Sequence, residues 1–123
     1  MSDQTTAPRA YRQTAVLSAS PAQLVVELYD GARRFLRQGA AAMSEREIEL
    51  AHNKLRRAET IISYLGEVVD DDQGELAASL HAIYAFSLRH LNEARMAQDP
   101  RMVQEVSALL GELRGAWQEV ARA

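Results

Sequence analysis

The chain has 123 residues, of which 47% are hydrophobic and 25% are charged, with a formal net charge of −3 and no cysteine. This length is that of one domain, which buries roughly two-thirds of its unfolded surface and so forms a single core without covalent staples. The missing cysteines exclude disulfides, thiolate metal ligands and cysteine nucleophiles, and the scattered basic residues give little support to nucleic-acid binding, which needs clustered positive charge.

The first 19 residues are predicted to be a flexible N-terminal arm or a short cap helix. Residues 1–9 are small and polar, without the apolar core of a signal peptide. Apolar anchors follow at Tyr11, Val16 and Leu17, and they need a surface on which to lie. No stretch approaches the roughly 20 apolar residues of a membrane span, so we expect a cytoplasmic protein without membrane insertion.

The first long helix is predicted to begin at Ser20-Pro21 and to end near Met43-Ser44. Ser20 suits the N-cap because its hydroxyl can accept a free backbone N–H, and Pro21 has no N–H to leave unpaired. Apolar residues then recur with a 3.6-residue period, which predicts one buried face. The residues of this face are Leu24, Leu28, Ala32, Phe35 and Gly39, with Val25, Tyr29 and Leu36 beside them.

Three more helices follow with the same rhythm, separated by the run Asp70–Gly74 and by Asp99-Pro100, where an N-cap precedes a proline. No segment alternates with the period of a strand. Residues 20–123 are therefore predicted to form an all-α antiparallel four-helix bundle. The three expected buried seams are Ile48, Ala51, Leu55, Ala58, Ile62, Leu65 and Val69; Ala77, Leu80, Tyr84, Ser87, Leu91 and Ala94; and Val103, Val106, Leu110, Leu113, Trp117 and Val120.

Two features depart from a plain bundle. Five of the 6 glycines lie inside predicted helices, where each costs up to about 1 kcal/mol relative to alanine. They indicate either a close approach of two helices or a face flattened to receive another backbone. In addition, a second apolar set lies off the seams; it either widens the buried stripe or forms an exposed groove for a partner. Its members are Val26, Ile61, Tyr64, Val68, Leu76, Ile83, Phe86, Leu88, Met102 and Leu109.

Catalytic and metal sites find weak support. A di-iron bundle needs two Glu-x-x-His motifs, and the chain has one, at Glu49 and His52. No serine stands in a G-x-S-x-G elbow. Asp30 is expected to cap or to pair with Arg33 or Arg34 one turn on, which is an ordinary surface role.

Two other classes of binding or signalling protein stay open. A histidine phosphotransfer domain is also a small four-helix bundle, and His52 followed by Lys54 resembles its pattern of a helical histidine followed by a basic residue. In that family the leucine stands two residues after the histidine, whereas here Leu55 is three residues on and the glycine is missing. A generic adaptor that binds unrelated helical segments is the other alternative.

Taken together, these blocks resemble the flagellin export chaperone family (FliS) over residues 10–120. No single match decides the assignment, and the order and spacing of the matches carry it. One departure is Arg95, where the family usually has asparagine. The matching residues are Ala10, Tyr11, Val16, Ala19, Ser20, Pro21, Leu24, Val25 and Leu28–Ala32; Asn53, Ala58, Ile61 and Leu65; Tyr84, Arg89, Leu91 and Ala94; and Val106, Leu113, Ala116 and Trp117.

The resemblance implies a binding protein without catalytic residues, cofactor or small-molecule substrate. Its expected partners are the C-terminal segment of flagellin, which it would keep from polymerising early, and the membrane component of the flagellar type III export gate. Aromatic residues lead such interfaces. The expected partner-binding residues are Tyr11, Val16, Leu17, Ile61, Tyr64, Val68, Leu76, Ile83, Tyr84 and Phe86. The arm either covers the client groove until the client displaces it or is a permanent strap.

Overall fold

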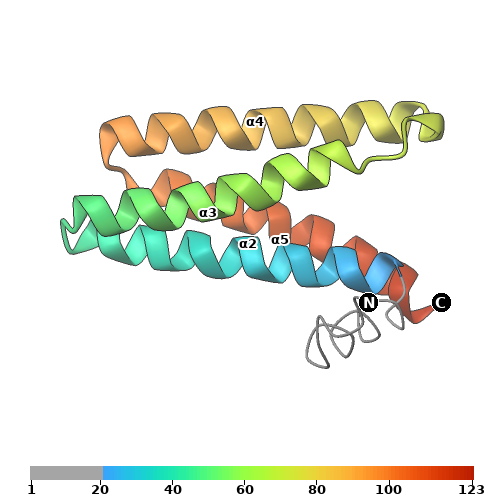
Figure 1. The fold of residues 1–123 in the computed structure, drawn as a ribbon, viewed down its shortest axis with the longest axis horizontal. Helices are drawn as coiled ribbons and strands as arrows, with labels where there is room; N and C mark the ends of the chain where they lie inside the picture. The colour runs from blue at the N-terminus through green and yellow to red at the C-terminus, as the bar shows by residue number, and fades with distance from the viewer. Residues whose placement is uncertain (1–20) are drawn as a thin grey trace, which may run out of the picture.

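The computed structural model describes residues 21–123 and shows them as a bundle of four long helices (Figure 1). The predicted all-α bundle is confirmed, and the first helix ends where the sequence indicated. The chain has no strand in this described range. The helices are α2 (Pro21–Ser44), α3 (Ile48–Glu67), α4 (Glu75–Ala97) and α5 (Pro100–Arg122), with the short 3-10 helix η2 (Asp71–Gln73) between α3 and α4.

The link between α4 and α5 follows the predicted cap-then-proline pattern. Gln98 ends α4 in the left-handed conformation, with φ 53°, and its backbone N–H reaches the carbonyls of Ala94 and Arg95. Asp99 then caps α5, because its carboxylate Oδ1 accepts the backbone N–H of Arg101 at 2.9 Å. Two residues are therefore enough to reverse the chain, and α5 runs antiparallel to α4.

Each helix packs against two neighbours. α2 lies along both α3 and α5, and α4 closes the bundle by packing on α3 and α5 (Figure 1). Across the core, the Tyr29 hydroxyl of α2 hydrogen-bonds to the Tyr84 hydroxyl of α4. The largest fully buried side chains are Tyr29, Leu36, Leu55, Ile62, Leu91 and Leu110.

The predicted seams are confirmed best in the middle of the chain. All six predicted α4 positions are buried, as are the five central ones of α3. The seams fail at the ends of the bundle, where helices have fewer neighbours: Ile48 is 62% and Val120 57% exposed. Val69 follows the end of α3, and it packs partly buried against the core, as do Leu113 and Trp117 of α5.

The predicted face of α2 is confirmed at Tyr29, Ala32, Leu36 and Gly39, but the centre of the buried stripe is rotated from the predicted one. Leu24, Leu28 and Phe35 are only half-buried, whereas Val26, which the sequence placed off the seam, is 1% exposed. The reason is that α2 packs on two helices at once, so its most buried line runs between α3 and α5. That line consists of Val26, Tyr29, Ala32, Leu36, Gly39 and Met43.

Two of the helical glycines mark close approaches between helices. A Cβ at Gly39 would lie 3.0 Å from Leu55 Cδ2 of α3. A Cβ at Gly111 would lie 2.9 Å from the guanidinium carbon of Arg33, whose Nε donates to the Ser107 carbonyl at 3.0 Å. Nothing lies within 4 Å of a Cβ at Gly115, so packing does not require glycine there.

Arg95, which departs from the resembled pattern, has a defined contact. Its Nη2 donates to Glu59 Oε2 at 2.6 Å, and both side chains are about four-fifths buried, at 20% and 19% exposed. The pair joins α4 to α3 near the Gln98 turn. An arginine here therefore ties two helices together.

Candidate functional site

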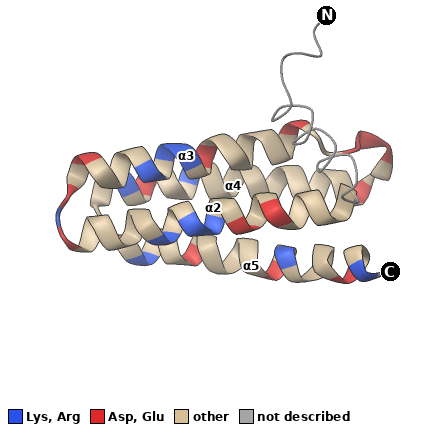
Figure 2. Cartoon of the chain, turned by 60° about the horizontal axis from the view of Figure 1, so that its bottom comes forward, with Lys and Arg blue, Asp and Glu red and all other residues tan. Residues whose placement is uncertain are grey.

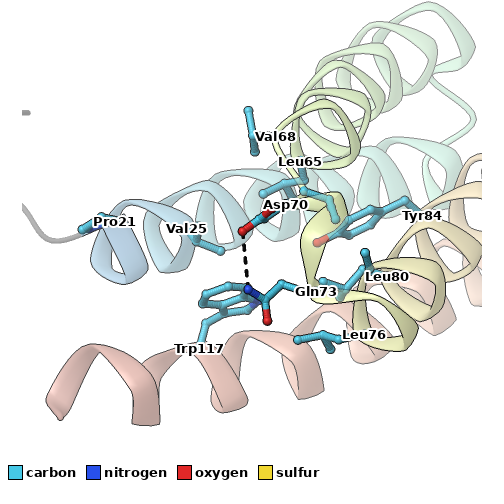
Figure 3. A pocket seen from close by; sticks show the side chains of 12 residues that line it. Pro21, Val25, Leu65, Val68, Asp70, Gln73, Leu76, Leu80, Tyr84 and Trp117 are labelled. Atoms are coloured by element: carbon cyan, nitrogen blue, oxygen red, sulfur yellow. Dashed lines mark hydrogen bonds between the residues drawn. The ribbon is translucent and has the colours of Figure 1, made fainter.

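A cleft of about 220 Å³ opens at the end of the bundle where α3 gives way to α4 (Figure 3). The chain leaves α3 after Glu67 and passes through η2 before α4 begins at Glu75, so several apolar residues around this connection face an opening. The lining is mostly aliphatic and aromatic, as in sites that receive apolar groups. It consists of Pro21, Val25, Leu65, Val68, Val69, Asp70, Gln73, Leu76, Ala77, Leu80, Tyr84 and Trp117.

One tyrosine, Tyr84, forms part of the inner wall of this cleft. Tyr84 lines it while remaining 5% exposed, and its hydroxyl meets that of Tyr29, which is fully buried. Burial raises the pKa of the Tyr29 phenol far above its usual range, and the hydrogen bond to Tyr84 acts in the same direction. Burial also raises the pKa of Tyr84. Both phenols therefore stay neutral at physiological pH.

At the rim of the cleft, Asp70 and Asp71 form hydrogen bonds with nearby residues of the chain. Asp70 Oδ1 accepts the backbone N–H of Asp72 at 3.0 Å, and Asp70 Oδ2 accepts from Gln73 Nε2 at 3.4 Å (Figure 3). Asp71 pairs with His81 Nε2 of α4 at 2.9 Å. These carboxylates shape the connection between α3 and α4.

The predicted partner-binding residues divide into three groups. Val68 and Leu76 lie at the cleft with exposed fractions of 49% and 55%, and Tyr84 lies in its inner wall. Tyr64 and Phe86 are 49% and 43% exposed on α3 and α4, while Ile61 and Ile83 are half-buried. Tyr11, Val16 and Leu17 lie outside the described residues.

The cleft also contains residues that the sequence did not assign to a partner site. Val25, Leu65, Val69, Leu80 and Trp117 were placed on or beside buried seams, yet they line the opening. The signal available in the sequence was their position: Val69 immediately precedes the aspartate run, and Trp117 lies near the end of its seam.

Asp30 and His52 both lie outside the cleft. The predicted pairing of Asp30 with Arg33 or Arg34 is wrong. Instead, Asp30 Oδ1 accepts a hydrogen bond from Nε of Arg114 on α5 at 2.6 Å. A pairing within one turn of α2 was expected from the sequence, but α5 places Arg114 beside Asp30. That hydrogen bond raises the pKa of the Arg114 guanidinium. His52 is exposed on α3.

Residues 21–123 contain no group of three or more histidine or acidic side chains placed to hold a metal ion. Within that range, no helix combines the length and the apolar character needed to cross a bilayer.

Comparison with known proteins gives one consistent result. The family model described as flagellar protein FliS matches residues 4–123. The flagellar secretion chaperone FliS of Bacillus subtilis is 33% identical over 110 residues, covering 89% of this chain and 82% of that protein. The Vibrio cholerae protein of the same name is 32% identical, covering 91% of this chain and 86% of its own. The flagellar secretion chaperone FliSB of Pseudomonas aeruginosa is 32% identical, covering 94% and 95%.

Proposed function

Because this chain belongs to the FliS family of flagellar secretion chaperones, we propose that it binds the C-terminal segment of flagellin in the cytoplasm and delivers it to the flagellar type III export apparatus. In this role it keeps flagellin from polymerising before export. The family is one of chaperones, and the proposed work is binding without catalysis, in which side chains supply contact surface. The membrane component of the export gate is the proposed second partner.

The observation that carries this proposal is the apolar surface around the cleft. Val68, just after α3, and Leu76, at the start of α4, line the cleft and are 49% and 55% exposed, and Phe86 farther along α4 is 43% exposed. Large exposed apolar side chains grouped in this way mark interaction sites. A client segment that is unfolded when free gains contacts by laying its apolar side chains there, at an ordering cost of about 2–5 kcal/mol.

The proposed binding mode is a helix or extended segment lying in a groove. Such a segment places apolar residues at intervals of three or four, and these match pockets on the receiving surface. The cleft takes one anchor side chain, since its volume of about 220 Å³ suits a single large residue. In this proposal Tyr64 of α3 and Phe86 of α4 extend the contact beyond the cleft, and Ile61 and Ile83 are half-buried positions on the same two helices.

We further propose that residues 1–19 are an arm that competes with the client for this surface, and that residues 20–123 are the bundle. Pro21, where the described chain begins, lines the cleft, so the arm is attached at its edge. Tethering places Tyr11, Val16 and Leu17 near the cleft at an effective concentration of the order of millimolar. The alternative is a permanent strap that stabilises the fold.

Titration calorimetry with the flagellin C-terminal segment tests the main proposal. Leu76→Ser and Phe86→Ser should each weaken binding by about tenfold or more, because hot-spot substitutions cost about 2 kcal/mol. The matched control is Ile48→Ser, an apolar residue that is at least as exposed and lies at the other end of the bundle. Equal losses in all three variants, or tail-independent binding of flagellin, would contradict the proposal.

Deleting residues 1–17 separates the two roles of the arm. Displacement predicts tighter client binding with little change in thermal stability, since the competitor is gone. A strap predicts unchanged affinity together with a lower melting temperature. Calorimetry and thermal unfolding on the same two proteins therefore give opposite results for the two ideas.

A further inference from the structure

Three cations surround one aromatic ring on the α2–α3 face, away from the cleft. The Phe35 ring centroid lies 5.6 Å from Arg34 Cζ, 5.7 Å from Lys54 Nζ and 5.7 Å from Arg57 Cζ. We call Arg34, Phe35, Lys54 and Arg57 the basic patch. Figure 2 shows the basic residues gathered on the middle of α2 and on the facing part of α3.

These cations lack counter-ions in the described chain. Within residues 21–123 no ion pair joins Arg34, Lys54 or Arg57 to a carboxylate; nearby Asp30 is taken by Arg114, and Glu59 by Arg95. Like charges at this spacing repel one another, and the electron-rich ring face offsets only part of that repulsion. Binding an anion at the basic patch would therefore relieve this repulsion.

We propose that the basic patch docks an acidic segment of a partner protein, separately from the apolar client at the cleft. Guanidinium groups match carboxylates through paired, planar hydrogen bonds, and Arg34 and Arg57 supply two such groups. Lys54 adds a third positive charge beside the same ring. The half-buried Phe35 ring gives the same segment an apolar contact.

A nucleic acid fits this surface less well than a protein. Tight binding to a phosphate backbone takes many cation contacts along its path. Here the patch is small, the whole chain has a net charge of −3, and Glu27 and Asp30 follow on the same helix toward its N-terminus. A short acidic stretch of protein neutralises three cations without crossing those carboxylates.

The test is fluorescence anisotropy with a labelled helical peptide that carries glutamates along one face, and with its glutamine analogue. The wild-type chain should bind the glutamate peptide at low salt and not the glutamine peptide. Arg34→Gln/Arg57→Gln should weaken that binding about tenfold, since each exposed ion pair changes an equilibrium by up to about fivefold. Lys54→Gln alone should weaken it about threefold, which serves if the double variant does not fold.

The matched control is Arg56→Gln/Arg101→Gln, which removes the same charge from exposed positions outside the patch. It should bind the peptide within about twofold of wild type. The proposal is overturned if this control loses as much affinity, or if the glutamine peptide binds equally well. It is also overturned if single-stranded poly-uridine displaces the peptide at lower concentration, or if Arg34→Gln/Arg57→Gln abolishes binding of the flagellin tail.

Discussion

The two hydroxyls that meet across the core should be strongly coupled. We expect Tyr29→Phe and Tyr84→Phe each to lower the free energy of unfolding, while the double substitution costs less than their sum. Tyr29 is 0% and Tyr84 5% exposed, so removing one hydroxyl leaves the other buried without this partner. A buried polar group left in that state costs about 1–3 kcal/mol.

Removing both hydroxyls leaves two phenyl rings of the same shape and no orphaned group from this pair. We therefore expect the double variant to lose about 1 kcal/mol, with a coupling energy of at least about 1 kcal/mol. Urea unfolding followed by far-ultraviolet circular dichroism measures all four corners of the cycle. Tyr64→Phe is the matched control, because Tyr64 is 49% exposed and should change stability by less than about 0.5 kcal/mol. An additive cycle would refute the reasoning.

Three further predictions concern stability. Gly39→Ala should lower the free energy of unfolding by about 1–3 kcal/mol, because its Cβ would meet Leu55 Cδ2 at 3.0 Å. Gly115→Ala, whose Cβ would have nothing within 4 Å, should raise it by up to about 1 kcal/mol. The urea midpoints of the two variants should therefore shift in opposite directions from that of the wild type. Asp99→Ala should cost about 0.5–2 kcal/mol through the lost cap, and Asp99→Ser should restore most of it; a midpoint unchanged in the alanine variant would argue against the cap. The buried tyrosine pair predicts alkaline instability. Both phenols have a raised pKa in the folded state, so their contribution is complete below the unfolded value of 10.0 and is lost as pH rises above it. The slope should not exceed about 2.7 kcal/mol per pH unit, the limit for two protons, and the double phenylalanine variant should flatten it; an unchanged slope would point to other groups.

The sequence predicted the bundle well because helix periods and caps are local. The α4 seam from Ala77 to Ala94 and the cap at Asp99 depend on residues within a few positions of one another. The rotation of α2 depends on which two helices it contacts, and no spacing within Pro21–Ser44 contains that fact. The same holds for Asp30, whose partner Arg114 lies 84 residues away.

The candidate site was predicted in part. Val68 and Leu76 stood out as apolar residues off the seams, and both lie at the cleft. Val25 and Trp117 did not, since a periodic pattern identifies the inward face of a helix but not the point at which neighbouring helices part. Residues at that point follow the periodic pattern of core residues, but in the structure they line the cleft.

The pairing of the first described helix with the last has a consequence for synthesis. α2 packs along α5, so one wall of its buried line comes from residues near the end of the chain. Contacts between segments so far apart in sequence form late, after the loop between them has closed. While the ribosome still holds α5, α2 lacks that cover, although α3 and α4 have already been made and can pack on each other. The core is therefore completed only after α5 has emerged from the ribosome.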